Sequence, residues 1–423
     1  MSSGRRHSRD DIVVPGDKSI SHRALMLAAV ARGTSRVGLP LASLDVRSTA
    51  RVLRQLGTPV SPVRPGATVE IRGGATWRSP GDPLHCGNSG TTARLLLGLV
   101  AGHPLEARFT GDRSLRRRPM RRVTEPLAAM GARFPDGAEC LPIRILGGTL
   151  QPVQWSSPVA SAQVKSAILL AGLAGGVGVT VSEPARSRDH TERMLRGLGC
   201  DVQVDGTTVS YRPGAPIPGF EWRVPGDPSS AAFMVAAAVL GRRGAIRCVD
   251  VGVNPTRTGF FEALARMGAV CGREGSRELA GEPVADLVAA PAALRAITVS
   301  EGEIPAMIDE IPMLACLAAR AEGRSTFRGL AELRVKESDR LALLAQNLGA
   351  IGVAVAVDGD TLHVTGTERP LAGPVRTAGD HRIAMAFSVL DTEGTLAIDD
   401  LDCADVSFPG FARMLTQVRR QVG

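Results

Sequence analysis

One pattern of hydrophobic and polar positions recurs six times along the chain. A short polar stretch leads into an Ala/Leu-rich run that carries almost no charge. The polar stretches begin at Ser19, Asn88, Ser161, Ser229, Asp309 and Asp380. Their spacing of roughly 70 to 80 residues is typical of repeated structural units. Because a helix that is apolar all round must be buried on all sides, we predict six helices at the centres of the hydrophobic cores.

A second set of segments, polar on one face and apolar on the other, alternates with the first and predicts six amphipathic helices. These segments span residues 45–57, 119–131, 188–199, 256–268, 336–349 and 407–420. The first five end at a glycine, as helix C-termini often do. Stretches typical of strands follow, such as 202–204 and 353–357. The pattern therefore predicts an α/β (α+β) fold of repeated units, each with one buried helix, one amphipathic helix and several short strands.

The size and charge of the chain limit its domain number and its partners. Its 423 residues suggest two or three domains, and an apolar fraction of 44 % suffices for large cores. The formal net charge of +8 favours anionic partners. Aromatic residues make up only 3 %, too few for stacking along a nucleic-acid strand. Phosphorylated metabolites are therefore the favoured ligands, and we expect no nucleic-acid partner.

The cysteine and histidine positions indicate a protein without disulfides or metal. None of the seven cysteines forms a C-x-x-C pair, which fits a reducing cytoplasm. None of the seven histidines has a metal-ligand spacing. Residues 1–10 lack the apolar core of a secretory signal, and the long uncharged stretch 166–182 is interrupted by glycines. We expect a cytoplasmic protein with no metal, no cofactor and no membrane span.

Basic and amide side chains accompany the polar starts of the first three buried helices. Helix N-termini carry free N–H groups and the positive end of the helix dipole, so they attract anions. The candidate ligands at these starts are Lys18, Ser19, Arg23, Gly90, Ser161 and Gln163. Ordinary N-capping by Ser, Asn and Asp accounts for any single start. It does not account for the Lys, Arg and Gln residues beside the caps.

The second half of the chain supplies carboxylates as well as bases. Asp309 begins one buried helix, and Asp380 begins another, in which Arg382 follows. Lys336 and Arg340 are four residues apart and would share one face of an amphipathic helix. Surface pairing explains that spacing equally well. A carboxylate beside Lys or Arg can act as a general base, with a pKa that the cations tune.

Five strings in a fixed order resemble the EPSP (5-enolpyruvylshikimate-3-phosphate) synthase family. They are Pro-Gly-Asp-Lys-Ser-Ile-Ser-His-Arg (15–23), Gly-Asn-Ser-Gly-Thr (87–91), Arg-Pro-Met (118–120), Arg-Val-Lys-Glu-Ser-Asp-Arg (334–340) and Gly-Asp-His-Arg-Ile-Ala-Met (379–385). The resemblance covers nearly the whole chain. It implies two globular domains, each of three βαβαββ-like units, with the active site in the cleft between them.

The resemblance also implies where the chain crosses between the domains. The crossings are expected near 14–17 and 223–227. Domain I would then hold residues 1–15 and 226–423, and domain II residues 16–225.

The implied reaction belongs to aromatic amino-acid biosynthesis through the shikimate pathway and chorismate. The enolpyruvyl group of phosphoenolpyruvate moves to the 5-hydroxyl of shikimate-3-phosphate, through a tetrahedral intermediate, and phosphate is released. Such an enzyme is a 3-phosphoshikimate 1-carboxyvinyltransferase, expected to be a monomer that binds these two small molecules. Two anionic substrates held side by side need fixed cations, as the basic motifs would supply.

The resemblance assigns roles to individual residues. Shikimate-3-phosphate would be held by Lys18, Ser19, Arg23, Ser161, Gln163, Asp309 and Lys336, with a further contact from Ser187 or Arg188. Phosphoenolpyruvate would be held by Lys18, Gly90, Arg118, Gln163, Arg340 and Arg382. Asp309 would accept the proton of the 5-hydroxyl, and Glu337 and Lys18 are the candidates for the proton at the methylene carbon. These three are the expected catalytic residues.

Two positions bear on the donor site. Some family members carry a lysine where this chain has Val406, so one phosphoenolpyruvate contact is missing or supplied elsewhere. The herbicide glyphosate occupies the donor site in sensitive members, and a Cβ at Gly90 would intrude on it. The alternative is that Gly90 only permits a tight turn with positive φ.

Two other functions compete with this interpretation. The related transferase acting on UDP-N-acetylglucosamine typically has Lys-Asn at the first motif and a cysteine before Arg-Pro. This chain has Lys18-Ser19 and no cysteine in 110–119. A nucleic-acid binder, on a fold like that of RNA 3′-phosphate cyclases, would use the basic run 113–122. It leaves Asp309 and Glu337 without a role.

Overall fold

The computed structural model describes residues 11–423, which divide into two compact units. The N-terminal unit comprises Gly16–Val224 together with Glu278–Glu282. The C-terminal unit comprises the described residues through Pro15, with Pro225–Arg277 and Pro283–Gly423. Each unit has a hydrophobic core of its own.

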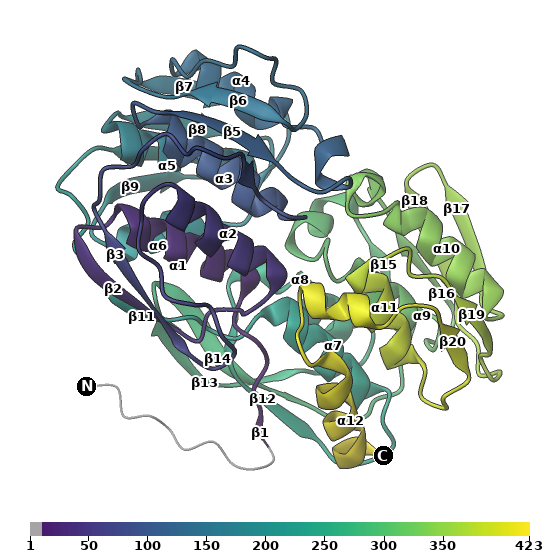
Figure 1. The fold of residues 1–423 in the computed structure, drawn as a ribbon. Coiled ribbons are helices and arrows are strands. Elements are labelled where there is room, and N and C mark those ends of the chain that lie inside the picture. Colours follow the sequence, from purple (N-terminus) through teal and green to yellow (C-terminus); the bar gives the residue numbers. More distant parts are fainter. Residues whose placement is uncertain (1–10) are drawn as a thin grey trace. The chain divides into compact units, whose positions relative to one another are not determined.

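The six nearly uncharged helices predicted from the sequence are present and buried. They are α1 (Lys18–Val30), α3 (Gly90–Ala101) and α5 (Ala162–Gly175) in the N-terminal unit, and α7 (Pro228–Val239), α9 (Ile311–Ala318) and α11 (His381–Leu390) in the C-terminal unit (Figure 1). Helices α3 and α5 pack so closely that a Cβ at Gly98 would lie 2.2 Å from the carbonyl oxygen of Ala167. Glycine is therefore the residue that this contact requires.

The amphipathic helices alternate with the buried ones, as predicted. They are α2 (Leu44–Gln55), α4 (Arg121–Ala129), α6 (His190–Gly197), α8 (Gly259–Arg266), α10 (Arg340–Ala350) and α12 (Phe411–Val422). The short 3₁₀ helices are η1 (Leu115–Arg117), η2 (Pro255–Arg257), η3 (Glu301–Ala306), η4 (Ala331–Val335) and η5 (Asp402–Val406). The glycines predicted to end α2, α4, α6 and α8 all have positive φ.

Two predictions about α10 are wrong. Its first residue is Arg340, because the Asp339 side chain accepts a hydrogen bond of 3.0 Å from the backbone N–H of Ala342 and caps the helix there. Lys336 lies before the helix, at the end of η4, and so shares no helix face with Arg340. Gly349 lies inside α10, and the turn that follows uses Gly352, at φ 91°.

Each sheet of the N-terminal unit combines one parallel pair with one or more antiparallel strands. In the first sheet, β2 (Gly33–Gly38) pairs in parallel with β11 (Glu221–Arg223) and antiparallel with β3 (Thr68–Gly73). The second contains β4 (Leu84–His85), β5 (Glu106–Thr110) and β6 (Ile143–Leu146). The third contains β7 (Val153–Ser156), β8 (Val179–Ser182), β10 (Thr208–Arg212) and β9 (Asp201–Asp205).

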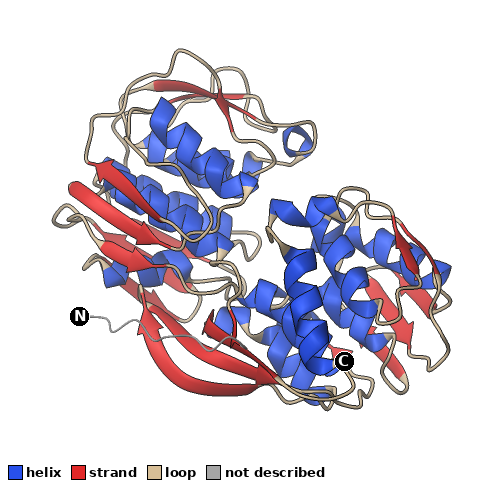
Figure 2. Cartoon of the chain, turned by 60° about the horizontal axis from the view of Figure 1, so that its bottom comes forward, coloured by secondary structure: helices blue, strands red, loops and turns tan. Residues whose placement is uncertain are grey.

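Two of the three sheets of the C-terminal unit repeat this arrangement. β1 (Asp11–Ile12) pairs in parallel with β12 (Ile246–Gly252), followed by β14 (Glu282–Ala289) and β13 (Gly272–Leu279). The second sheet contains β15 (Thr298–Val299), β16 (Arg324–Phe327), β18 (Thr361–Thr365) and β17 (Ala354–Asp358). The third is the parallel pair β19 (Gly373–Val375) and β20 (Leu396–Ile398). In both units the helices (blue in Figure 2) pack against the strands (red), which confirms the predicted mixed α/β class.

Three negative findings apply to residues 11–423. No helix there is long and apolar enough to cross a membrane. No group of three or more His, Cys, Asp or Glu side chains in that range could hold a metal ion. All seven cysteines are free thiols.

Candidate functional site

Polar side chains gather at the N-terminal ends of the buried helices in both units. At α1, Asp17 caps the helix by accepting a 2.8 Å hydrogen bond from the N–H of Ile20. The next residue, Lys18, forms an ion pair with Asp45. Ser19 is half-buried, and its hydroxyl makes no side-chain hydrogen bond to any described residue. The Lys18 ammonium and the Ser19 hydroxyl therefore lie together at the N-terminal end of α1.

Arg23 is a buried cation that three hydrogen bonds hold in place. Nε donates to Thr191 Oγ1 at 2.7 Å, Nη2 to Ser166 Oγ at 2.8 Å, and Nη1 to the carbonyl of Ser19 at 3.0 Å. Burial lowers the pKa of Arg23 to about 10, a shift that the charge of Glu192 opposes. The guanidinium therefore stays protonated at neutral pH and is fixed by side chains from α5 and α6.

Gly90 lies between two arginines at the start of α3. A Cβ there would be 3.1 Å from Arg94 Nη1 and 3.6 Å from Arg118 Nη1. The alternative that Gly90 serves a turn with positive φ is wrong, because Gly90 is the first residue of the helix. The left-handed turn belongs instead to Gly87, at φ 62°.

Gln163, at the start of α5, joins this part of the N-terminal unit to α3. Arg94 Nη1 donates to Gln163 Oε1 at 2.5 Å, and Gln163 Nε2 donates to Thr91 Oγ1 at 3.0 Å. Arg118 is oriented by a 2.6 Å hydrogen bond from Nη2 to Asn88 Oδ1. The predicted residues Gly90, Arg118 and Gln163 are thus brought to the adjoining ends of two packed helices.

Arg340 organises the polar cluster of the C-terminal unit. It is 1 % exposed; Nε lies 2.9 Å from Asp380 Oδ2 and Nη2 lies 2.7 Å from Glu337 Oε2. Nη1 is 3.6 Å from Asp309 Oδ1, beyond hydrogen-bond distance, and has no hydrogen-bond partner. Burial would lower the pKa of Arg340, but the charges of Asp380, Glu337 and Asp309 outweigh it and raise that pKa.

A second buried arginine, Arg382, stands beside this cluster. Its Nη1 is 4.0 Å from Glu310 Oε1, and its guanidinium lies 5.9 Å from the centre of the Phe233 ring. The backbone N–H of Arg382 donates to Asp380 Oδ1 at 2.9 Å, which caps α11. Lys336 is half-buried at the end of η4, in the same chain segment as Glu337.

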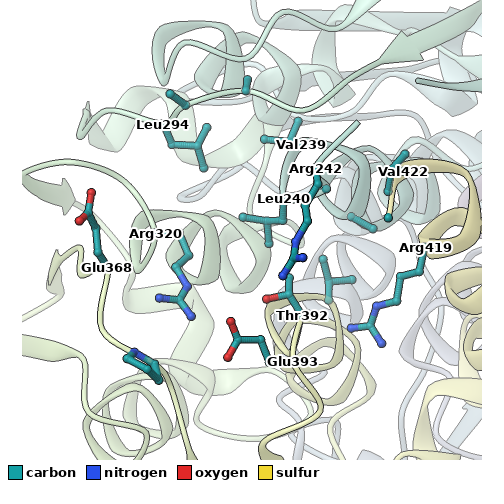
Figure 3. Close-up of a pocket in the computed structure, with 17 residues that line it drawn as sticks. Val239, Leu240, Arg242, Leu294, Arg320, Glu368, Thr392, Glu393, Arg419 and Val422 are labelled. Atoms are coloured by element: carbon teal, nitrogen blue, oxygen red, sulfur yellow. The ribbon is translucent and has the colours of Figure 1, made fainter. Parts of the chain in front are cut away.

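A pocket of about 560 Å³ in the C-terminal unit is not part of this cluster (Figure 3). None of the predicted site residues lines it. Two of the arginines that line the pocket donate hydrogen bonds to backbone carbonyls. Arg320 donates to the carbonyls of Thr367 and Arg369. Arg419 donates to the carbonyl of Ser388 at 2.6 Å. These arginines satisfy carbonyls where the chain turns, so the polar clusters and not this pocket are the candidate site.

Known proteins identify the family. The model of the family described as EPSP synthase (3-phosphoshikimate 1-carboxyvinyltransferase) matches residues 4–415. The chain is 49 % identical to the 3-phosphoshikimate 1-carboxyvinyltransferase of Gloeobacter violaceus, over 98 % of each chain. The corresponding protein of Desulforudis audaxviator is 46 % identical, again over 98 % of each chain. The chain belongs to the EPSP synthase family. The resemblance seen in the five sequence motifs is thereby confirmed.

Solved structures of EPSP synthases agree with the fold. An EPSP synthase from Acinetobacter baumannii is 38 % identical and superposes with a TM-score of 0.86, covering 96 % of this chain and 95 % of that one. The enolpyruvyl transferase NikO from Streptomyces tendae superposes with a TM-score of 0.73 at 19 % identity, covering 98 % of this chain and 95 % of that one. That second likeness extends to the fold alone.

Several charged partners in these clusters were not among the predicted site residues. Asp45 pairs with Lys18, and Asp380 holds Arg340. In the N-terminal unit, Lys165 lies between Glu183 and Glu192. Lys165 gave one signal in the sequence, since it is the only charged residue in the apolar helix α5. Asp45, Glu183 and Glu192 gave none, because they lie in segments whose packing the local pattern does not specify.

Proposed function

We propose that this chain is a 3-phosphoshikimate 1-carboxyvinyltransferase. A bond would form between the 5-oxygen of shikimate-3-phosphate and C2 of phosphoenolpyruvate, while a proton adds to C3. Loss of phosphate from C2 and of a proton from C3 would then restore the double bond. Within this family, the observation that carries the proposal is Arg340, whose buried Nη1 donor is uncommitted while three carboxylates surround the guanidinium.

The basic test is phosphate release. Phosphoenolpyruvate should yield inorganic phosphate only when shikimate-3-phosphate is also present, at a rate above about 1 s⁻¹, which is typical of metabolic enzymes. UDP-N-acetylglucosamine in place of shikimate-3-phosphate should give none. Release that depends on the nucleotide sugar instead would assign the chain to the other branch of enolpyruvyl transferases.

The proposed residue roles follow from the resemblance and agree with the local chemistry. Asp309 would take the 5-hydroxyl proton; its side chain is 19 % exposed, so a substrate can reach it. Glu337 and Lys18 are the proposed carriers of the methylene proton. Arg340 would bind the phosphoenolpyruvate carboxylate through its free Nη1 donor. The remaining predicted binding residues keep the roles that the resemblance implies.

The choice between Ser187 and Arg188 as an added phosphate contact favours Arg188. The Ser187 hydroxyl donates its one proton to Glu183, with distances of 2.8 and 2.7 Å to the two carboxylate oxygens. A hydroxyl has only one proton to donate. Ser187 would therefore have to give up this bond to donate to a phosphate, whereas a guanidinium has five donors.

The proposed active site combines residues of both units and would lie in the cleft that the resemblance implies. Anionic substrates neutralise cations on both sides, so binding should draw the units together. Small-angle scattering should then show a smaller radius of gyration with saturating shikimate-3-phosphate than without ligand. An unchanged radius, even with shikimate-3-phosphate and glyphosate together, would contradict closure.

Gly90→Ala should weaken inhibition by glyphosate more than it weakens phosphoenolpyruvate binding. The new Cβ would lie 3.1 Å from Arg94 Nη1, so this guanidinium must shift by a few tenths of an ångström. Alanine is a better helix former than glycine, so the variant should fold. We expect the inhibition constant to rise about tenfold or more, with a smaller rise in the Michaelis constant for phosphoenolpyruvate.

Gly148→Ala is the matched control for this variant. It adds a Cβ with nothing within 4 Å in the same unit, and should leave both constants unchanged. Equal increases of the two constants in Gly90→Ala would show that the methyl group does not distinguish inhibitor from substrate.

The basic residue expected near Val406 has no replacement within η5. That helix contributes the acidic side chains Asp402 and Asp405, and Val406 is half-buried at its end. We propose that Arg340 and Arg382 supply the donor-site charge in its place. The expected cytoplasmic location and monomeric state are part of the same proposal, and the free cysteines support the former.

A further inference from the structure

A buried network of charges links two of the residues proposed to bind the acceptor. Lys165, Glu183 and Glu192 have side chains only 2–3 % exposed. The Lys165 ammonium is 2.7 Å from Glu183 Oε2 and 2.9 Å from Glu192 Oε1. Both contacts are ion pairs between buried side chains of opposite charge. Burying charged side chains costs free energy even when they are paired, which indicates a role for this network beyond packing.

Glu183 connects this network to the start of α5. Its Oε1 accepts a 2.8 Å hydrogen bond from the backbone N–H of Ser161, and the same carboxylate accepts the Ser187 hydroxyl. Ser161 is the N-cap of α5, so fixing its backbone also fixes where its hydroxyl points. That hydroxyl accepts only a long 3.5 Å bond from the N–H of Val164, which leaves its proton for a ligand.

The other end of the network leads to Arg23. Glu192 follows Thr191, whose hydroxyl accepts from Arg23 Nε and bonds to Ser166 Oγ at 2.7 Å. Glu192 also provides the main attraction that opposes the effect of burial on the pKa of Arg23. The Lys165 ammonium, 2.7 Å from Glu183 Oε2, offsets the charge of that carboxylate. An anion approaching Ser161 would then meet no net negative charge from Glu183.

We propose that Glu183, neutralised by Lys165, is a positioning residue for the phosphate group of the acceptor substrate. It holds the Ser161 backbone so that the Ser161 hydroxyl presents a fixed donor to that phosphate. The inference rests on the proposed function for the identity of that phosphate. A purely structural role, in which Glu183 only ties β8 to α5, predicts a loss of stability without a loss of phosphate recognition.

Glu183→Gln separates the two roles. Glutamine can still accept from the Ser161 N–H through its one oxygen. It carries no charge to form an ion pair with Lys165, and it lacks the second acceptor oxygen that the Ser187 hydroxyl contacts in the wild type. We expect the dissociation constant for shikimate-3-phosphate, measured by calorimetry, to rise roughly 10- to 100-fold, the range for a lost hydrogen bond to a charged group. Binding of shikimate, which lacks the phosphate, and the Michaelis constant for phosphoenolpyruvate should change less than about threefold.

Two further variants complete the design. Glu125→Gln removes a carboxylate of the same unit that lies on the exposed face of α4 and pairs with Arg121, and should leave all three constants unchanged. If Glu183→Gln does not fold, Lys165→Met/Glu183→Gln removes both charges together and should show the same selective loss. A folded variant that binds shikimate-3-phosphate as well as wild type would overturn the inference. Wild type that does not bind shikimate-3-phosphate at all would instead overturn the proposed function.

Discussion

Asp309→Asn should lower turnover by about 10²- to 10⁴-fold, the usual contribution of a general base. The substitution keeps the size of the side chain and removes its ability to take a proton. Asp309 is partly exposed, and its Oδ1 lies 3.6 Å from Arg340 Nη1, so the carboxylate faces a fixed cation. Since asparagine can still accept hydrogen bonds, the dissociation constant for shikimate-3-phosphate should change by less than about tenfold.

Rapid-quench kinetics would locate this effect in the chemical step. Formation of the tetrahedral intermediate should slow by the same factor as turnover, because the base acts when the 5-hydroxyl adds to C2. The matched control is Asp358→Asn, an exposed aspartate at the end of β17 in the same unit, which should behave as wild type. Near-normal turnover by Asp309→Asn would remove Asp309 from the mechanism.

The buried helices were predictable because their signal is local. Runs such as 228–239 carry no charge at all, and every residue of α7 is buried. The start of α10 was not predictable in the same way. Asp339 and Arg340 both look like surface residues of one helix in the sequence. Asp339 caps the helix locally, but the burial of Arg340 depends on its ion pair with Asp380, forty positions away along the chain.

The same limit applies to the candidate site. The cations Lys18, Arg23 and Arg340 stand in short motifs that can be found by eye. Their carboxylate partners come from other elements, as Asp45 does from α2 for Lys18. Charge partners of this kind depend on which helix faces meet, and a period of hydrophobic residues does not specify that.

Arg340→Met should destabilise the protein by about 3–5 kcal/mol, the typical result of removing one partner of a buried ion pair. Methionine fills part of the space but leaves Asp380, which is 0 % exposed, without its cation. The Ser338 hydroxyl would still donate to Asp380 Oδ2, at 2.7 Å, and does not replace the charge. Denaturant unfolding at neutral pH should show the loss as a lower midpoint.

Arg334→Met is the control for Arg340→Met. Arg334 lies in the same motif and pairs with Asp339 and Asp360, but its side chain is 37 % exposed. Solvent screens such pairs, so the midpoint of this variant should stay close to that of wild type. Equal losses in the two variants would show that burial of the Arg340 pair has no special effect.

The pH dependence of the Arg340→Met deficit tests its cause. Burial alone would raise the pKa of Asp380, but the charge of Arg340, helped by His381, outweighs it and holds that pKa below its usual value. A carboxyl with a lowered pKa stabilises the fold above its unfolded pKa of about 3.9, and this stability is lost as the pH falls through the folded value. Without Arg340 the pKa of Asp380 rises, so the buried carboxyl can become neutral on mild acidification. The difference in unfolding free energy between wild type and variant should therefore be largest near pH 7 and shrink toward pH 4. A difference that stays constant over this range would mean that lost packing, and not the stranded charge of Asp380, destabilises the variant.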